Sequence, residues 1–129
     1  MFVPISIGRV YDAAEAAEMR ILVDRLWPRG VSKTRRLWDL WIPDVAPSTA
    51  LRRWYGHVPD RWEEFCRRYR EELEQQRGTP ALAELIRLVD QQPVRLLTAT
   101  KDVQQSHLPV LQECLERWSR GEVAPLPPC

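Results

Sequence analysis

Short, continuous runs of apolar residues are the clearest feature of the hydrophobic pattern. Three of them, residues 3–10, 20–26 and 94–100, are rich in aliphatic and β-branched side chains and predict strands. The second and third runs lack apolar–polar alternation, which is typical of strands buried on both faces of a parallel sheet. Residues 37–43 do alternate, and they predict a short edge strand that Pro43 closes.

Helical periodicity fills most of the chain between the later runs. Ser48 is predicted to cap a short helix that stops at Gly56, and Asp60 to cap a longer one. The longer helix carries an apolar stripe at positions i, i+3, i+4 and i+7, formed by Trp62, Phe65, Cys66, Tyr69 and Leu73. Such a stripe is typical of the buried face of an amphipathic helix.

Two further helices follow. Thr79 with Pro80 is a typical helix start, and Ser106 is a candidate cap for the last helix. Because strands alternate with helices, the fold class is predicted as α/β: a single three-layer Rossmann-like domain with a mainly parallel sheet flanked by helices. The domain is expected to span residues 1–120, and the proline-rich residues 121–129 to form a disordered C-terminal tail.

Composition narrows the class of protein. With 129 residues and a formal net charge of +1, the chain has no strong overall field, which disfavours nucleic acid as a partner. No apolar run reaches the length of a membrane span and no export signal is present, so we expect a cytoplasmic protein with no membrane partner. Three widely spaced cysteines form no CxxC pair and predict neither a disulfide framework nor a zinc site.

Motifs for common cofactors are missing from the sequence. There is no GxGxxG dinucleotide loop, no GxxxxGK[ST] phosphate loop and no GxSxG elbow. The two histidines, His57 and His107, are fifty residues apart and no HExxH occurs, so no metal is expected. The sequence therefore predicts no cofactor.

Basic residues follow the predicted strands, at the edge where parallel sheets place their ligands. Arg9 follows the first strand, Arg25 and Arg29 the second, and Lys101 the last. Lys33 and Lys101 are the only lysines, and codon usage in a GC-rich genome explains the preference for arginine better than phosphate binding does. We interpret Arg9, Arg25, Arg29 and Lys101 as candidate ligand-binding residues.

The turn at residues 25–30 is the most constrained of these segments. Pro28 fixes its own φ and restricts Trp27, and Gly30 permits a conformation that other residues resist. Such a turn can hold Arg25 and Arg29 towards a phosphate or carboxylate, with Trp27 as a stacking face in the ligand site. The alternative is that Trp27 plugs the edge of the core and that Arg25 pairs with an internal carboxylate, for which the candidates are Asp24, Asp39 and Asp44.

His57 and His107 are the candidate acid–base residues. His107 precedes the predicted last helix, whose N-terminus favours an anion, but a lone histidine there is more often a cap or a surface residue. His57 either projects towards the site or only helps to end one helix and orient the next. Lys101 is equally well interpreted as part of a surface ion pair with Asp102. A catalytic role for either histidine is therefore a hypothesis.

Three stretches of the sequence resemble the YeaO-like family of bacterial proteins (domain of unknown function 488): ILVDRLWPRGVSK, APSTALRRWYGHVPDRWEEFCRRY and LLTATKDVQQSH. The resemblance extends from Val3 to about Trp118 and implies a small cytoplasmic Rossmann-like α/β domain, in a family mostly without an established activity. In that family the last buried strand often ends in a Cys-Ala-Glu-like stretch, whereas Thr98, Ala99 and Thr100 stand here. The departure excludes a covalent cysteine mechanism at this strand end.

These observations favour a protein whose cationic crevice takes a small anionic ligand, such as a nucleotide or a phosphorylated metabolite. Whether it is an enzyme stays open at this point. The alternatives are a nucleic-acid-binding module and a protein-interaction module without catalysis. The second alternative includes a homodimer, rather than a monomer, joined through an exposed aromatic edge at Trp38 and Trp41.

Overall fold

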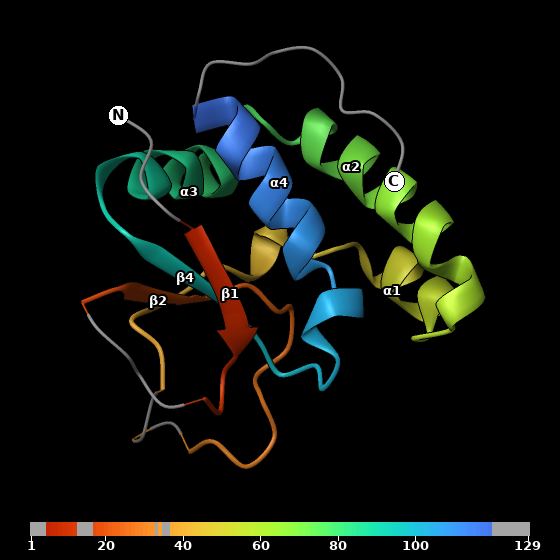
Figure 1. Cartoon of the computed structure of the whole chain (residues 1–129), viewed down its shortest axis with the longest axis horizontal. Helices are drawn as coiled ribbons and strands as arrows, with labels where there is room; N and C mark the ends of the chain where they lie inside the picture. Colours follow the sequence, from red (N-terminus) through yellow and green to blue (C-terminus); the bar gives the residue numbers. More distant parts are fainter. Residues whose placement is uncertain (1–4, 13–16, 33, 35–36, 120–129) are drawn as a thin grey trace.

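A four-stranded parallel sheet forms the centre of the fold (Figure 1). The computed structural model describes residues 5–12, 17–32, 34 and 37–119. The strands are β1 (Ile5–Arg9), β2 (Met19–Leu22), β3 (Leu40–Trp41) and β4 (Val94–Thr98), in the order β1-β4-β2-β3. Every pairing between these strands is parallel, which confirms the predicted α/β class and the short edge strand. The expected C-terminal tail lies outside the described residues.

Helices flank the sheet, but within the described residues none lies between β1 and β2 or between β2 and β3, so the predicted alternation of strands and helices does not extend to the first three strands. The α-helices in the described part of the chain are α1 (Thr49–Tyr55), α2 (Trp62–Gln75), α3 (Pro80–Gln91) and α4 (Leu108–Ser119). Short 3-10 turns precede α1, α2 and α4, and these are η1 (Pro43–Val45), η2 (Pro59–Arg61) and η3 (Val103–Gln105). None of the helices in the described ranges is long and apolar enough to cross a membrane.

All four strands end earlier than the hydrophobic pattern predicts, and after β2 and β4 polar side chains accept backbone N–H groups. β2 stops at Leu22, and the Asp24 carboxylate (Oδ2) accepts the backbone N–H of Ala99 at 2.8 Å. β4 stops at Thr98, whose hydroxyl accepts the N–H of Thr100 at 3.1 Å. Both segments therefore leave the sheet at its carboxyl edge.

Ser48 and Gly56 bound α1 as predicted. The Ser48 hydroxyl accepts the N–H of Leu51 at 3.1 Å, and Gly56 takes a left-handed φ of 51°. Glu72 of α2 accepts both the N–H and the hydroxyl of Ser48, at 2.8 and 2.6 Å. The start of this short helix is thus fixed to α2.

The predicted cap at Asp60 is wrong. Asp60 lies within η2, which Pro59 begins, and α2 starts at Trp62 without a side-chain cap. Because the 3-10 turn runs directly into α2, its own hydrogen bonds take the place of a side-chain cap. Thr79 does hold the N-cap position of α3, but its hydroxyl donates to the carbonyl of Gln76.

Two hydrophobic clusters cover the two faces of the sheet. Successive residues of a strand point to opposite faces, and Leu96 and Leu97 of β4 belong to different clusters. The larger cluster takes in residues from all four α-helices. The smaller one, within the described residues, is built from strand and loop residues, and it contains Trp38. Since Trp38 is buried, of the two tryptophans expected at an aromatic edge only Trp41 is exposed.

Candidate functional site

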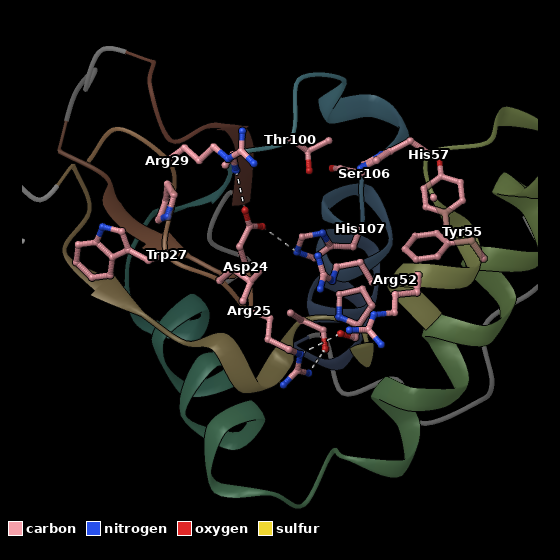
Figure 2. Close-up of a pocket in the computed structure, with 18 residues that line it drawn as sticks. Asp24, Arg25, Trp27, Arg29, Arg52, Tyr55, His57, Thr100, Ser106 and His107 are labelled. Atoms are coloured by element: carbon pink, nitrogen blue, oxygen red, sulfur yellow. Dashed lines mark hydrogen bonds and ion pairs between the residues drawn. The ribbon is translucent and has the colours of Figure 1, made fainter. Parts of the chain in front are cut away.

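A pocket of about 550 Å³ opens at the carboxyl edge of the sheet (Figure 2). Its lining comes mainly from residues 24–29 after β2, from residues between 46 and 57 around α1, and from residues between 99 and 107 after β4. Parallel sheets of this class bind their ligands at this edge. The volume lies in the range of roughly 300–1,000 Å³ that is typical of small-molecule sites.

Arg25 is held in the pocket wall by backbone carbonyls. Its Nη2 group donates to the carbonyl of Ala46 at 3.0 Å, and its Nε group donates to that of Pro47 at 3.3 Å. The positive charge of Arg25 therefore has no counter-charge in direct contact within the described structure. The internal acids considered as its partners do not pair with it there: Asp24, Asp39 and Asp44.

Trp27 lies in the constrained turn at residues 25–30 and lines the pocket. Its indole N–H donates to the carbonyl of Val31 at 2.6 Å, and its ring packs edge-on against Trp38 and Trp41, with centroid distances of 4.9 and 5.5 Å. Gly30 has a φ of 76°, in the left-handed region that favours glycine. Trp27 therefore lines the pocket and also closes the smaller hydrophobic cluster.

Arg29, Arg52 and Arg53 add three more guanidinium groups to the lining. All three residues are exposed, and none forms an ion pair within the described residues. Arg29 belongs to the predicted turn, whereas Arg52 and Arg53 were not foreseen. They lie in the last turn of α1, and only the orientation of this short helix brings them to the pocket. The sequence carries no signal for that orientation beyond the pair of arginines itself.

Asp24 and His107 lie against each other in the middle of the pocket (Figure 2). Nε2 of His107 is 3.0 Å from the carbonyl of Val23 and 3.6 Å from Oδ1 of Asp24. Because a carbonyl only accepts, Nε2 carries the proton in the neutral ring and Nδ1 does not. Burial lowers the pKa of His107 and outweighs the attraction of the Asp24 carboxylate. The ring is therefore neutral at pH 7, and its contact with Asp24 is not an ion pair.

The start of α4 places His107 in the pocket. The Ser106 hydroxyl accepts the N–H of Leu108 at 3.2 Å, so the predicted cap is present, and it donates to the carbonyl of Val103 at 2.6 Å. The His107 ring packs edge-on against Tyr69, with a centroid distance of 5.9 Å. His107 is thus a buried part of the pocket wall and not the surface residue of the alternative interpretation.

His57 stands in the pocket lining in a strained backbone conformation. Its φ is 59°, in the left-handed region that residues other than glycine rarely occupy, and it directly follows Gly56. Its ring lies 5.6 Å from that of Tyr55, whose hydroxyl donates to the carbonyl of Gln105 at 2.8 Å. Backbone strain of this kind is concentrated at functional sites.

Two predicted ligand-binding residues lie outside the pocket lining. Lys101 is an exposed residue between β4 and η3. Arg9 turns towards β4, where its Nη2 group donates to the carbonyl of Ala99 at 3.2 Å, and its guanidinium lies 4.9 Å from the ring centre of Tyr11. The predicted residues that the structure does bring together are Arg25, Trp27, Arg29, His57 and His107.

Comparison with known proteins assigns the chain to a family. A family model described as "Inactive DUF488-N3 subclade" matches residues 4–129. The chain belongs to this DUF488 family. The uncharacterized protein Rv3073c of Mycobacterium tuberculosis (strain ATCC 25618 / H37Rv) is 43% identical over 112 residues, which cover 86% of this chain and 92% of that protein. The uncharacterized protein YeaO of Escherichia coli (strain K12) is 41% identical over 114 residues, which cover 86% of this chain and 96% of that protein.

These matches confirm the resemblance to the YeaO-like DUF488 family that the sequence motifs indicated. No solved structure gives a significant match. The similarity to these two relatives extends over almost their whole length.

Two cysteines of this DUF488 chain are buried in α2 and α4 and do not line the pocket. Burial raises the pKa of the Cys114 thiol to about 12, which makes it a poor nucleophile. In the part of the chain that the structure describes, no cluster of three or more His, Cys, Asp or Glu residues is placed to hold a metal. The charged and titratable groups that the pocket offers a ligand are guanidinium groups, one carboxylate, a phenol and imidazoles.

Proposed function

We propose that this DUF488 protein binds a small anionic ligand, a nucleotide or another phosphorylated metabolite, in the arginine-lined pocket. The observation that carries the proposal is the charge of the described lining, which contains four arginines and a single carboxylate. Guanidinium groups form paired, charge-assisted hydrogen bonds with phosphate and carboxylate oxygens. The arginines are Arg25, Arg29, Arg52 and Arg53, and the carboxylate is that of Asp24.

The arrangement of these charges supports a ligand larger than a single ion. In Figure 2, Arg29 and Arg25 lie on opposite sides of Asp24. Guanidinium groups without counter-charges repel one another, and a bound phosphate relieves that repulsion. An anion in a partly enclosed pocket also gains more from each contact than one on the open surface. Both effects favour a polyatomic anion that reaches several arginines.

Binding without catalysis is favoured by two further observations. The matching family model describes its subclade as inactive. His107, the buried acid–base candidate, is neutral at pH 7, and its Nε2–H is donated to the carbonyl of Val23. A histidine in this state suits a role in shaping the pocket better than one in proton transfer.

A calorimetric titration tests the proposal. AMP, ATP, ribose 5-phosphate and inorganic phosphate are titrated into the wild-type protein and into the double variant Arg29→Ala/Arg52→Ala. Both side chains are exposed, so the fold should persist. We expect the variant to bind at least about tenfold more weakly than the wild type, because two charged contacts are lost.

The matched control is the double variant Arg67→Ala/Arg87→Ala. It changes the net charge equally but removes arginines that pair with glutamates on α2 and α3. We expect it to bind like the wild type. An equal loss of affinity in both double variants would mean non-specific attraction, and no binding of any compound to the wild type at millimolar concentration would refute the proposal.

A further inference from the structure

Asp24 is the one acid among the described residues of a pocket lining that is otherwise cationic. A carboxylate beside the ligand repels a plain anion, so its place there needs a reason. Its Oδ2 atom accepts the N–H of Ala99 at 2.8 Å, but a neutral amide oxygen would accept that N–H as well. The charge of Asp24 is therefore not explained by the end of β4.

The carboxylate of Asp24 also keeps much of its hydrogen-bonding capacity. Each carboxylate oxygen offers about two acceptor positions, and Oδ2 uses one of them for the N–H of Ala99. Oδ1 has no hydrogen-bond partner in the described structure but is itself buried. It lies 3.6 Å from Nε2 of His107, which is beyond hydrogen-bonding distance, and that N–H is donated to the carbonyl of Val23. The Asp24 side chain lines the pocket and is 17% exposed, and because Oδ1 is buried, a ligand can meet the carboxylate only at Oδ2.

The lining thus offers a ligand both positively charged guanidinium groups and one negatively charged carboxylate. Arg25 and Arg29, on opposite sides of Asp24 in Figure 2, accept negative charge. Asp24 between them accepts hydrogen bonds from a neutral or positive donor. A ligand that fits both has an anionic group and, close to it, hydrogen-bond donors.

Resting on the proposed anion site, we infer that the ligand is a ribose phosphate, either free or as part of a ribonucleotide, and that its sugar hydroxyls donate to Asp24. The arginines hold the phosphate and the carboxylate holds the sugar. A site that hydrogen-bonds a hydroxyl discriminates strongly against the analogue that lacks it, because its polar groups are then left without partners. Asp24 is the residue that selects for the sugar.

Titration calorimetry with paired compounds tests this assignment. AMP is compared with 2′,3′-dideoxy-AMP, and ribose 5-phosphate with 2-deoxyribose 5-phosphate, so that the partners of each pair differ only in sugar hydroxyls. We expect the wild type to bind the hydroxylated member of at least one pair about tenfold or more tightly than its partner. A preference confined to the second pair identifies the free sugar phosphate, and tighter binding of AMP identifies the ribonucleotide.

The variant Asp24→Asn separates the charge from the shape of the side chain. Its amide oxygen can still accept the N–H of Ala99, and we expect the preference for hydroxyls to fall below about threefold. Sulfate, which has no donor, should bind the variant as tightly as the wild type or more tightly, since a repulsive charge is removed. The matched control is Asp90→Asn on α3, an exposed residue with the same change of charge, and it should keep the preference.

The outcomes distinguish this inference from the proposed function. If the wild type binds both members of each pair equally, the sugar assignment is wrong while the anion site stands. If Asp24→Asn weakens sulfate and AMP alike, Asp24 acts only through the fold and the assignment is again wrong. If neither sulfate nor any phosphate compound binds the wild type, the anion site itself is refuted.

Discussion

On the outer faces of α2 and α3, arginines lie beside glutamates, whereas around the pocket they have no such partner in the described structure. Arg67 contacts Glu64 at 2.8 Å and Glu71 at 2.6 Å, and Arg87 contacts Glu84. Arg25 in the pocket donates to carbonyl groups instead. The same residue type thus has its charge neutralised in one region and retained in the other.

The two regions differ in the position of their arginines and not in residue type. Codon usage, as an explanation for arginine in place of lysine, would act on both regions equally. The lack of ion-pair partners for the pocket arginines, within the described residues, depends instead on where these arginines lie in the fold. A cluster of like charges opposes folding, so its presence at the carboxyl edge of a parallel sheet is consistent with the proposed ligand site.

The largest effect on stability is expected from Arg25→Met. The variant keeps the aliphatic stem and removes the donors to Ala46 and Pro47, so the segment before α1 loses its link to the end of β2. We expect the free energy of unfolding to fall by about 1.5–3 kcal/mol, the usual value of hydrogen bonds from a charged group. Urea denaturation of the ligand-free protein measures it. Arg67→Met is the control. An equal loss of unfolding free energy in both variants would mean that arginines in the pocket and on the helix surface contribute alike to stability.

A smaller effect is expected from pH, through His107. Burial lowers its pKa in the folded protein below the ordinary value of about 6.5, so the unfolded chain binds the proton more readily. Stability should therefore fall as pH drops below about 6.5 and level off once the folded protein is protonated too. His107→Gln keeps an N–H for the carbonyl of Val23 but does not titrate. Unfolding free energies measured between pH 8 and pH 5 should show a weaker dependence in the variant, and parallel curves would contradict the buried neutral ring.

Features that depend on local sequence were predictable. The apolar runs, the helix bounded by Ser48 and Gly56, and the turn with Gly30 all depend on neighbours within a few residues. The strand-end rule for parallel sheets also gave the edge at which the pocket opens. Patterns of this range were enough for the order of the elements and for the place of Arg25 and Arg29.

Contacts between distant segments were not predictable. Asp24 ends β2 early because its carboxylate meets Ala99, which is 75 positions along the chain. Arg52 reaches the pocket because Glu72 fixes the start of α1 from 24 positions away. The strand-end rule predicts the edge of the sheet at which a site opens, but not the direction in which each side chain points. Arg9 and Lys101, which were predicted to bind the ligand, therefore lie outside the pocket lining.

A third effect on stability is expected from the strained backbone of His57, which lines the pocket. His57 has a left-handed φ of 59°, which costs a residue with a Cβ about 1 kcal/mol and costs glycine very little. We expect His57→Gly to be about 1 kcal/mol more stable than His57→Ala, the control that loses the same imidazole but keeps the strain. Thermal and urea unfolding measure the difference. Equal stability of the two variants would mean that the loop relaxes and that no strain is held there.

The smallest effect is expected on the helical side, from Glu64→Gln. Hydrogen bonds from Arg67 and then from Arg68 lower the pKa of Glu64 from its ordinary value to about 2. Because the folded pKa is the lower one, the ionised carboxylate stabilises the protein above about pH 4.5, and this contribution is lost as pH falls towards 2. At pH 7 the variant should therefore melt only slightly below the wild type. The gap should close at low pH and shrink in 1 M salt, because exposed pairs are weak and screened.

Binding of AMP or inorganic phosphate by Glu64→Gln should equal that of the wild type, because Glu64 is not among the residues that line the pocket. The contrast between the two regions would fail if this variant lost as much stability as Arg25→Met. It would also fail if its phosphate affinity changed, since the charge around α2 would then act on the ligand at long range. A small, salt-sensitive loss of stability with unchanged affinity would instead separate arginines that serve the helix surface from those that serve the site.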